Sequence, residues 1–137
     1  MVWRLSMKWR AAVDRAVAPF GLTHAQYVML ATLYGLSLQG ARPSQRELAD
    51  ATGLEPVYVS RLARTLESSG LIQRRDAPDD TRAVEITLTR RGEKIVIPAI
   101  AAVHKLHDEL LAAIGGPGSA ATHRFRNTLQ SLLREHP

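Results

Sequence analysis

The sequence predicts a mainly helical chain that carries a small β-hairpin. Three observations support this fold class. Apolar residues recur at helical spacing over most of the chain, the spacing changes to two between residues 71 and 88, and Ser, Thr, Gly and Pro stand where helical stretches begin or end. With 137 residues, the chain has about the length of one domain.

The first third of the chain predicts two helices. Apolar residues at helical spacing from Val2 onward predict the first helix, and the Pro19-Phe20-Gly21 stretch ends it. Thr23 suits the N-cap of a second helix, which we expect over residues 24–38. Residues 39–43 contain Gly40 and Pro43 and predict a loop.

A helix-turn-helix follows that loop. Ser44 and Glu47 have the spacing of a capping box, which predicts a short helix to about residue 51. Gly53 suits the tight turn after it, and Pro56 suits the first position of the next helix, which we expect to end at Ser69-Gly70. Two short helices joined by a glycine turn are typical of a helix-turn-helix.

The remaining chain predicts a hairpin and two more helices. Residues 71–75 and 84–88 have strand character, and residues 76–81 form a turn cluster, so the hairpin should project as a wing. Thr89 then caps a long helix, which we expect to reach about Ile114 with a kink at Pro98. After the Gly115-Gly116-Pro117-Gly118 break, a last helix begins near Ser119.

Composition excludes several function classes. The chain has no cysteine, so disulfides and thiolate metal sites are excluded, and its net charge of +5 fits a polyanionic partner. No apolar run is long enough to span a bilayer, and no signal-peptide core is evident, so we expect a cytoplasmic location. Because we find neither a nucleophile-elbow constellation nor a glycine-rich phosphate loop, we expect no enzyme activity and no cofactor.

Two histidines raise a metal-binding alternative. His104 and His107 stand three residues apart on the long helix, a spacing compatible with a shared zinc ion. His107, however, lies on the apolar stripe of that helix, and His104 lies near its edge. We therefore favour interface or pocket residues and predict no metal site.

The order and spacing of short motifs resemble the multiple antibiotic resistance regulator (MarR) family of winged-helix repressors over nearly the whole chain. The strongest local matches are Ser44-Gln45-Arg46-Glu47-Leu48-Ala49, Gly53-Leu54, Val59-Ser60-Arg61-Leu62, Leu66-Glu67, Gly70-Leu71-Ile72, Asp80-Thr81-Arg82, and Leu88-Thr89 followed by Gly92. The resemblance implies one domain over residues 1–137. Within it, residues 39–89 would be a DNA-binding winged helix-turn-helix, and residues 1–38 and 90–137 would be dimerisation helices.

The second helix of the helix-turn-helix is the expected reader of DNA. The first residues of such a helix face base edges in the major groove, and here they are Pro56, Val57, Tyr58, Ser60 and Arg61. Arg61 is expected on guanine or on a phosphate. Members of the family usually carry small polar residues at the positions of Val57 and Tyr58, so packing roles remain an alternative for these two.

Further DNA contacts are expected around this helix. Arg64, Arg74 and Arg75 are candidates for phosphates, and a solvated surface is the alternative for Arg61, Arg74 and Arg75. The helix N-terminus at Ser44 and Gln45 can take a phosphate oxygen or simply be capped. The resemblance implies that Arg82 enters the minor groove from the wing. Asp80 would pair with an arginine and hold the shape of the wing.

The first and last helices each carry an apolar stripe that one small winged helix cannot cover. These stripes predict a homodimer that buries them. The candidate dimerisation residues are Leu5, Trp9, Val13, Phe125, Leu129, Leu132 and Leu133. Relatives of this type bind small, often phenolic or lipophilic ligands, and the candidate lining residues here are Trp9, Phe20, Tyr27, Tyr34 and His107, with core packing as the alternative. The rival for the whole chain is a winged helix that binds protein, or that coats DNA without sequence preference.

Overall fold

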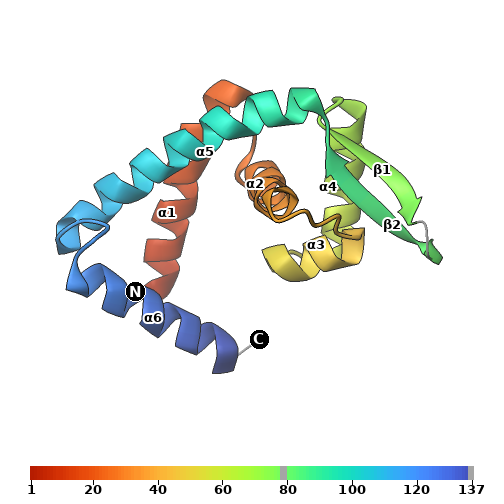
Figure 1. Cartoon of the computed structure of the whole chain (residues 1–137). Coiled ribbons are helices and arrows are strands. Elements are labelled where there is room, and N and C mark those ends of the chain that lie inside the picture. Colours follow the sequence, from red (N-terminus) through yellow and green to blue (C-terminus); the bar gives the residue numbers. More distant parts are fainter. Residues whose placement is uncertain (78–79, 136–137) are drawn as a thin grey trace.

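The structure, a computed structural model, describes residues 1–77 and 80–135, with only the backbone described at residues 77 and 80–82. Figure 1 shows a winged-helix end and a helical end joined by one long helix. The elements are α1 (Val2–Val17), the 3₁₀ turn η1 (Ala18–Phe20), α2 (His24–Leu38), α3 (Gln45–Thr52), α4 (Pro56–Ser68), β1 (Ile72–Ala77), β2 (Asp80–Leu88), α5 (Arg90–Leu111), the 3₁₀ turn η2 (Ala112–Ile114) and α6 (Ala120–Glu135). None of the helices described is long and apolar enough to cross a membrane.

Side-chain caps start three helices at the residues that the sequence indicates. The hydroxyl of Thr23 accepts from the amide of Gln26 at 3.2 Å, and the Ser44 hydroxyl accepts from the amide of Glu47 at 3.0 Å. In both capping boxes the third helical residue accepts back from the amide of the capping residue. The Thr89 hydroxyl accepts from the Gly92 amide at 3.0 Å. These bonds satisfy amide groups that a helix start leaves without a partner.

The hairpin is longer than the sequence predicts. β1 and β2 pair antiparallel from Ile72↔Leu88 to Asp76↔Val84, and the register shifts before the Ala77↔Asp80 pair. The expectation of a turn over residues 76–81 is therefore wrong at residues 76, 77, 80 and 81, which lie in strands. Aspartate is common in turns, but each paired strand residue gains partners for its backbone groups, and strand pairing overrides the local preference here. Residues 78–79 lie outside the described part of the chain.

The core surrounds α2, which Figure 1 shows between α5 and the short helices α3 and α4. Met29, Leu30 and Leu33 of α2 are 0–1% exposed. They belong to one buried cluster with Leu48 of α3, Leu66 of α4, Ile86 of β2 and Val96 of α5. Every element of the winged helix thus contributes to the same core as α2.

The core also takes residues that we expected elsewhere. Val13, a candidate dimerisation residue, is 4% exposed within the single chain and belongs to the buried cluster, so its own chain already covers most of its side chain. Phe20, Tyr27 and Tyr34 are partly buried and pack against the cluster. The packing alternative for these three aromatic residues is thus the one that fits the structure.

Helix α5 connects the two ends of the molecule. It runs as one helix from Arg90 to Leu111 with Pro98 inside, and it ends before the expected Ile114, which lies in the 3₁₀ turn η2. At its start, Gly92 is buried against the end of α4 and the hairpin, and a Cβ there would collide with the carbonyl oxygen of Leu71. This close approach fixes α5 to the base of the hairpin.

Candidate nucleic-acid interface

Helix α4 divides into a buried face and an exposed face. Val59, Leu62, Ala63 and Leu66 point into the core. On the opposite side, Val57 is 73% exposed and Tyr58 is 36% exposed. Pro56, Arg61 and Arg64 are also exposed, and Ser60 is half-buried. The candidate base-reading residues therefore lie on the side of α4 that solvent, or a DNA groove, can reach.

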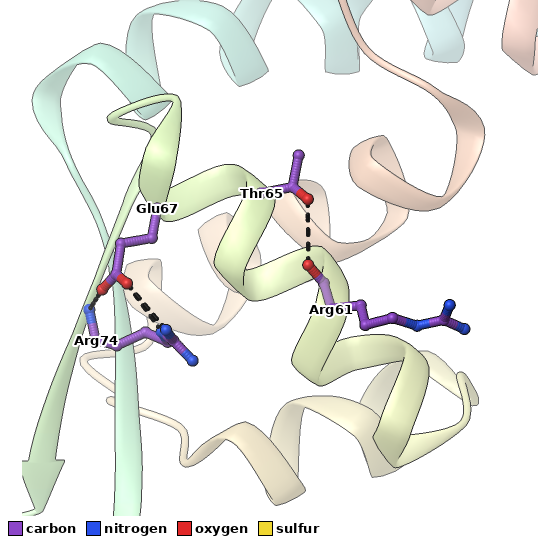
Figure 2. A network of polar contacts seen from close by, with 4 residues as sticks. All are labelled: Arg61, Thr65, Glu67 and Arg74. Atoms are coloured by element: carbon purple, nitrogen blue, oxygen red, sulfur yellow. Dashed lines mark hydrogen bonds and ion pairs between the residues drawn. The ribbon is translucent and has the colours of Figure 1, made fainter.

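Arg61 and Tyr58 are in contact on this face. The guanidinium carbon of Arg61 lies 5.8 Å from the centroid of the Tyr58 ring, within the range of a cation–π interaction. Figure 2 shows that the Arg61 side chain points away from the Glu67–Arg74 pair. The hydroxyl of Thr65 donates to the main-chain carbonyl oxygen of Arg61 at 3.2 Å. This bond does not involve the guanidinium of Arg61.

A second arginine has a structural partner that we did not foresee. The Nη2 and Nε atoms of Arg74 donate to Glu67 Oε1 at 3.0 and 3.2 Å, and the Arg74 amide donates to Oε2 at 3.2 Å. Figure 2 shows this pair between the end of α4 and β1. The hydrogen bonds from Arg74 hold the pKa of Glu67 below its ordinary value. Glu67 thus braces the base of the wing, and this contact depends on the turn at Gly70 rather than on a local sequence signal.

The described part of the wing includes one exposed arginine. Arg75 on β1 is exposed, and its Nη2 atom donates to Gln73 Oε1 at 3.2 Å. Arg82 and Asp80 belong to β2 by their backbones. Their side chains lie outside the described residues, so the minor-groove contact and the pairing of Asp80 stay predictions.

The loop before α3 brings a further basic residue to the hairpin. Arg42 is exposed and lines a hollow of about 220 Å³ together with Gln73, Arg75, Glu85 and Thr87. The Ile86 amide donates to the Pro43 carbonyl oxygen at 3.0 Å, which holds this loop against β2. Arg42 was not among the expected DNA contacts, although a basic residue two positions before a helix N-cap is well placed to meet an anion at that helix N-terminus. Both Ser44 and Gln45 are half-buried at that N-terminus.

A second candidate site lies at the helical end, far along α5 from the hairpin. Trp9 of α1 and His107 of α5 have ring centroids 5.5 Å apart, with planes tilted by 51°. They line an apolar groove of about 420 Å³, here called the α1/α5/α6 groove, with Val2, Leu5, Ser6, Leu111, Pro117, Thr122, Phe125, Arg126 and Leu129. Burial, and then the charge of His104, lower the pKa of His107 below its ordinary value, against the opposing effect of Asp108.

The groove includes some of the candidate dimerisation and ligand-pocket residues. It brings together Leu5, Trp9, Phe125 and Leu129, four of the candidate dimerisation residues. Of the candidate ligand-pocket residues it contains His107 and Trp9, which also packs against the core, but not Phe20, Tyr27 or Tyr34. Within the described part of the chain, no three His, Cys, Asp or Glu side chains are grouped so as to hold a metal ion.

Helices α3 and α4, with their glycine turn and the hairpin beside them, define a winged helix-turn-helix protein. The sequence model of the MarR family matches residues 22–84, from just before α2 into β2. An uncharacterized HTH-type transcriptional regulator of Bacillus subtilis (strain 168), YdcH, is 32% identical over 134 residues, which are 98% of this chain and 88% of that protein. The chain belongs to the MarR family of winged helix-turn-helix transcriptional regulators, as the sequence motifs predict.

Solved structures agree with this assignment over almost the whole chain. CouR from Rhodococcus jostii RHA1, bound to p-coumaroyl-CoA, is 30% identical with a TM-score of 0.81, and the match covers 96% of this chain and 87% of CouR. The transcriptional regulator MosR of M. tuberculosis, in complex with DNA, is 26% identical with a TM-score of 0.75, and that match covers 99% and 96% of the two chains. The predicted fold class, a winged helix flanked by N- and C-terminal helices, is confirmed.

Proposed function

We propose that this regulator binds a pseudo-palindromic operator as a homodimer and acts as a ligand-responsive repressor. The observation that carries the proposal is the exposed half of α4, where Val57, Tyr58 and Arg61 face solvent beside a projecting hairpin. A helix of 13 residues, about 20 Å long, fits the major groove. Because its partner is DNA, we expect the protein to act in the cytoplasm.

The proposed DNA contacts fall into two groups. Val57, Tyr58, Ser60 and Arg61 lie on the face of α4 that would meet base edges, and the apolar Val57 fits a thymine methyl group. Phosphate contacts are proposed for the exposed arginines around them, which are Arg42, Arg64 and Arg75. Arg74 contributes by orienting the wing, since its guanidinium is already bonded to Glu67. Arg82 would enter the minor groove from the wing.

The homodimer rests on the helical end of the molecule. Leu132 and Leu133 of α6 are 55% and 72% exposed, and they follow the groove residue Leu129 at helical spacing, so they share its side of the helix. Two-fold symmetry would place two copies of α4 about one helical turn of DNA apart, which is the spacing that a pseudo-palindrome requires. A small lipophilic or phenolic effector is proposed on the analogy of the p-coumaroyl-CoA in CouR.

Selection of bound duplexes from a random pool tests the function. The full-length protein should enrich a sequence whose two halves are related by two-fold symmetry, with centres about 10 base pairs apart. Competition should then show the selected duplex binding at least about a thousandfold more tightly than a scrambled duplex at physiological salt. Equal affinity for both duplexes would contradict the proposal and favour a winged helix that coats DNA without sequence preference.

A further inference from the structure

The contact between Tyr58 and Arg61 assigns these two residues to a single unit. We propose that Tyr58 is a positioning residue: its ring holds the Arg61 guanidinium toward one base pair of the operator, so that Tyr58 determines specificity through Arg61. This inference rests on the proposed sequence-specific binding and names how one part of that binding is built.

The geometry of α4 supports a shared role. Tyr58 and Arg61 are three residues apart, so their side chains lie one above the other on the same exposed face of the helix. The guanidinium carbon is 5.8 Å from the ring centroid. Guanidinium groups stack on aromatic rings because the ring face carries negative partial charge.

Arg61 is otherwise free to adopt many rotamers. Among the described side chains, no carboxylate forms an ion pair with it, in contrast to Arg74, which Glu67 holds. An unrestrained arginine loses much of its rotamer freedom when it binds a base, and a ring that already restricts it reduces that loss. The planar fork of the guanidinium also matches the O6 and N7 atoms of guanine only in a defined orientation.

The alternative role of Tyr58 is a hydroxyl bond to a phosphate. That contact would not depend on Arg61 and would strengthen binding to every sequence about equally, because phosphates carry no sequence information. The two roles therefore differ in which part of the tyrosine matters. Positioning needs the ring, and phosphate binding needs the hydroxyl.

Four full-length variants separate these roles on the selected operator. Each base pair of the operator is replaced in turn, and the dissociation constants of wild type, Arg61→Ala, Tyr58→Leu, Tyr58→Phe and Leu38→Ala give a preference at every position. We expect Arg61→Ala to abolish the preference for G·C at one position per half-site. Tyr58→Leu should reduce the preference at that same position by about two- to fivefold.

The two remaining variants are controls. Tyr58→Phe keeps the ring and should keep the preference, while Leu38→Ala shortens an exposed apolar side chain at the end of α2, outside the proposed DNA contacts, and should leave that base pair unaffected. Helix content and thermal unfolding establish that each variant is folded.

Three results would overturn the inference: Tyr58→Leu with wild-type preference at the Arg61 position, Tyr58→Phe with the loss seen in Tyr58→Leu, or Arg61→Ala without a change at any single base pair. A wild-type protein that prefers no base pair at all would instead refute the proposed function.

Discussion

Glu67 connects the recognition helix to the wing through a single carboxylate. Both of its oxygens accept from Arg74, one from the guanidinium and one from the main chain. Because the main-chain bond fixes β1 as well as the side chain, the orientation of the wing depends on the charge of one residue at the end of α4. A neutral acceptor would bind a guanidinium more weakly than a carboxylate does.

Glu67→Gln should therefore weaken the brace without changing the size of the side chain. In the folded wild type the pKa of Glu67 is lowered by the hydrogen bonds from Arg74, so its stabilising effect is present above the ordinary glutamate pKa. That effect is lost as pH falls through the lowered pKa of the folded state. Unfolding measured between pH 7 and pH 3 should show a smaller acid-induced loss of stability in the variant, and an unchanged pH profile would contradict the brace.

Arg82 and Arg64 should differ in the kind of DNA contact they make. If Arg82 enters the minor groove, Arg82→Ala weakens operator binding by about 1–3 kcal/mol, most strongly on A·T-rich flanks. Arg64→Ala should weaken binding to all sequences alike and lower the salt dependence by about one unit of slope, as the loss of a phosphate contact does. Titrations at several salt concentrations measure both effects. Normal affinity of Arg82→Ala at physiological salt would exclude the wing contact.

At the scale of elements, the first turn of α5 packs closely against the residues just before β1. Gly92 lies so close to the Leu71 carbonyl oxygen that a methyl group cannot be placed between them. The Thr89 hydroxyl also donates to the Gly70 carbonyl oxygen at 2.6 Å, so the helix start is bonded to the turn that ends α4. Movement of α5 would thus be transmitted to the base of the hairpin.

Gly92→Ala should destabilise the protein by about 1–3 kcal/mol, because backbone atoms must shift to admit the methyl group. Gly35→Ala is the matched control. Gly35 lies inside α2 with no atom within 4 Å of the added Cβ, so the change should stabilise the helix by about 0.5–1 kcal/mol. Chemical denaturation measures the free energy of unfolding, which should fall for Gly92→Ala and rise for Gly35→Ala. Equal stability of Gly92→Ala and wild type would show that the junction can relax.

Local signals predicted the elements, whereas long-range contacts could not be predicted. Thr23, Ser44 and Thr89 start helices because their hydroxyls bond to amides three residues ahead, which the sequence spacing reveals. The extension of the strands into residues 76 and 80 depends on pairing between two segments, and Asp76 gives no local sign of it. Helical spacing likewise placed Val13 on an apolar face without showing that its own chain covers that face.

The candidate site was predictable to a similar extent. The position of Arg61 on the helix showed that it would be exposed, since Leu62 and Ala63 had to face the core. The bond between Arg74 and Glu67 requires the turn at Gly70 to bring β1 back beside α4, and charge type alone does not indicate it. For this reason the bond to Glu67 was not among the expected contacts of Arg74.

At the scale of the whole molecule, the rest of the chain covers little of α6. Among its 16 residues only Thr122 is buried, and Leu129, Leu132 and Leu133 are 43%, 55% and 72% exposed. An isolated helix of this length is marginally stable in water, because most helical stability in proteins comes from packing an apolar face. We therefore expect a second copy of the chain to cover α6 and the groove beside it.

Leu133→Glu should convert the dimer into monomers, because a carboxylate buried in an apolar interface would be desolvated without a partner. The protomer should stay folded, since Leu133 is 72% exposed and makes no part of the core. Operator affinity should fall even though α4 and the wing are intact, because the two copies of α4 are no longer held at a fixed spacing.

Leu38→Glu is the matched control: Leu38 is 71% exposed at the end of α2, away from the groove, and the variant should remain dimeric. Removal of residues 119–137 should reproduce the effect of Leu133→Glu on assembly and on binding. Sedimentation at micromolar concentration measures the assembly, and a wild-type monomer, or a truncated chain that binds operator as tightly as the intact one, would overturn the role of α6.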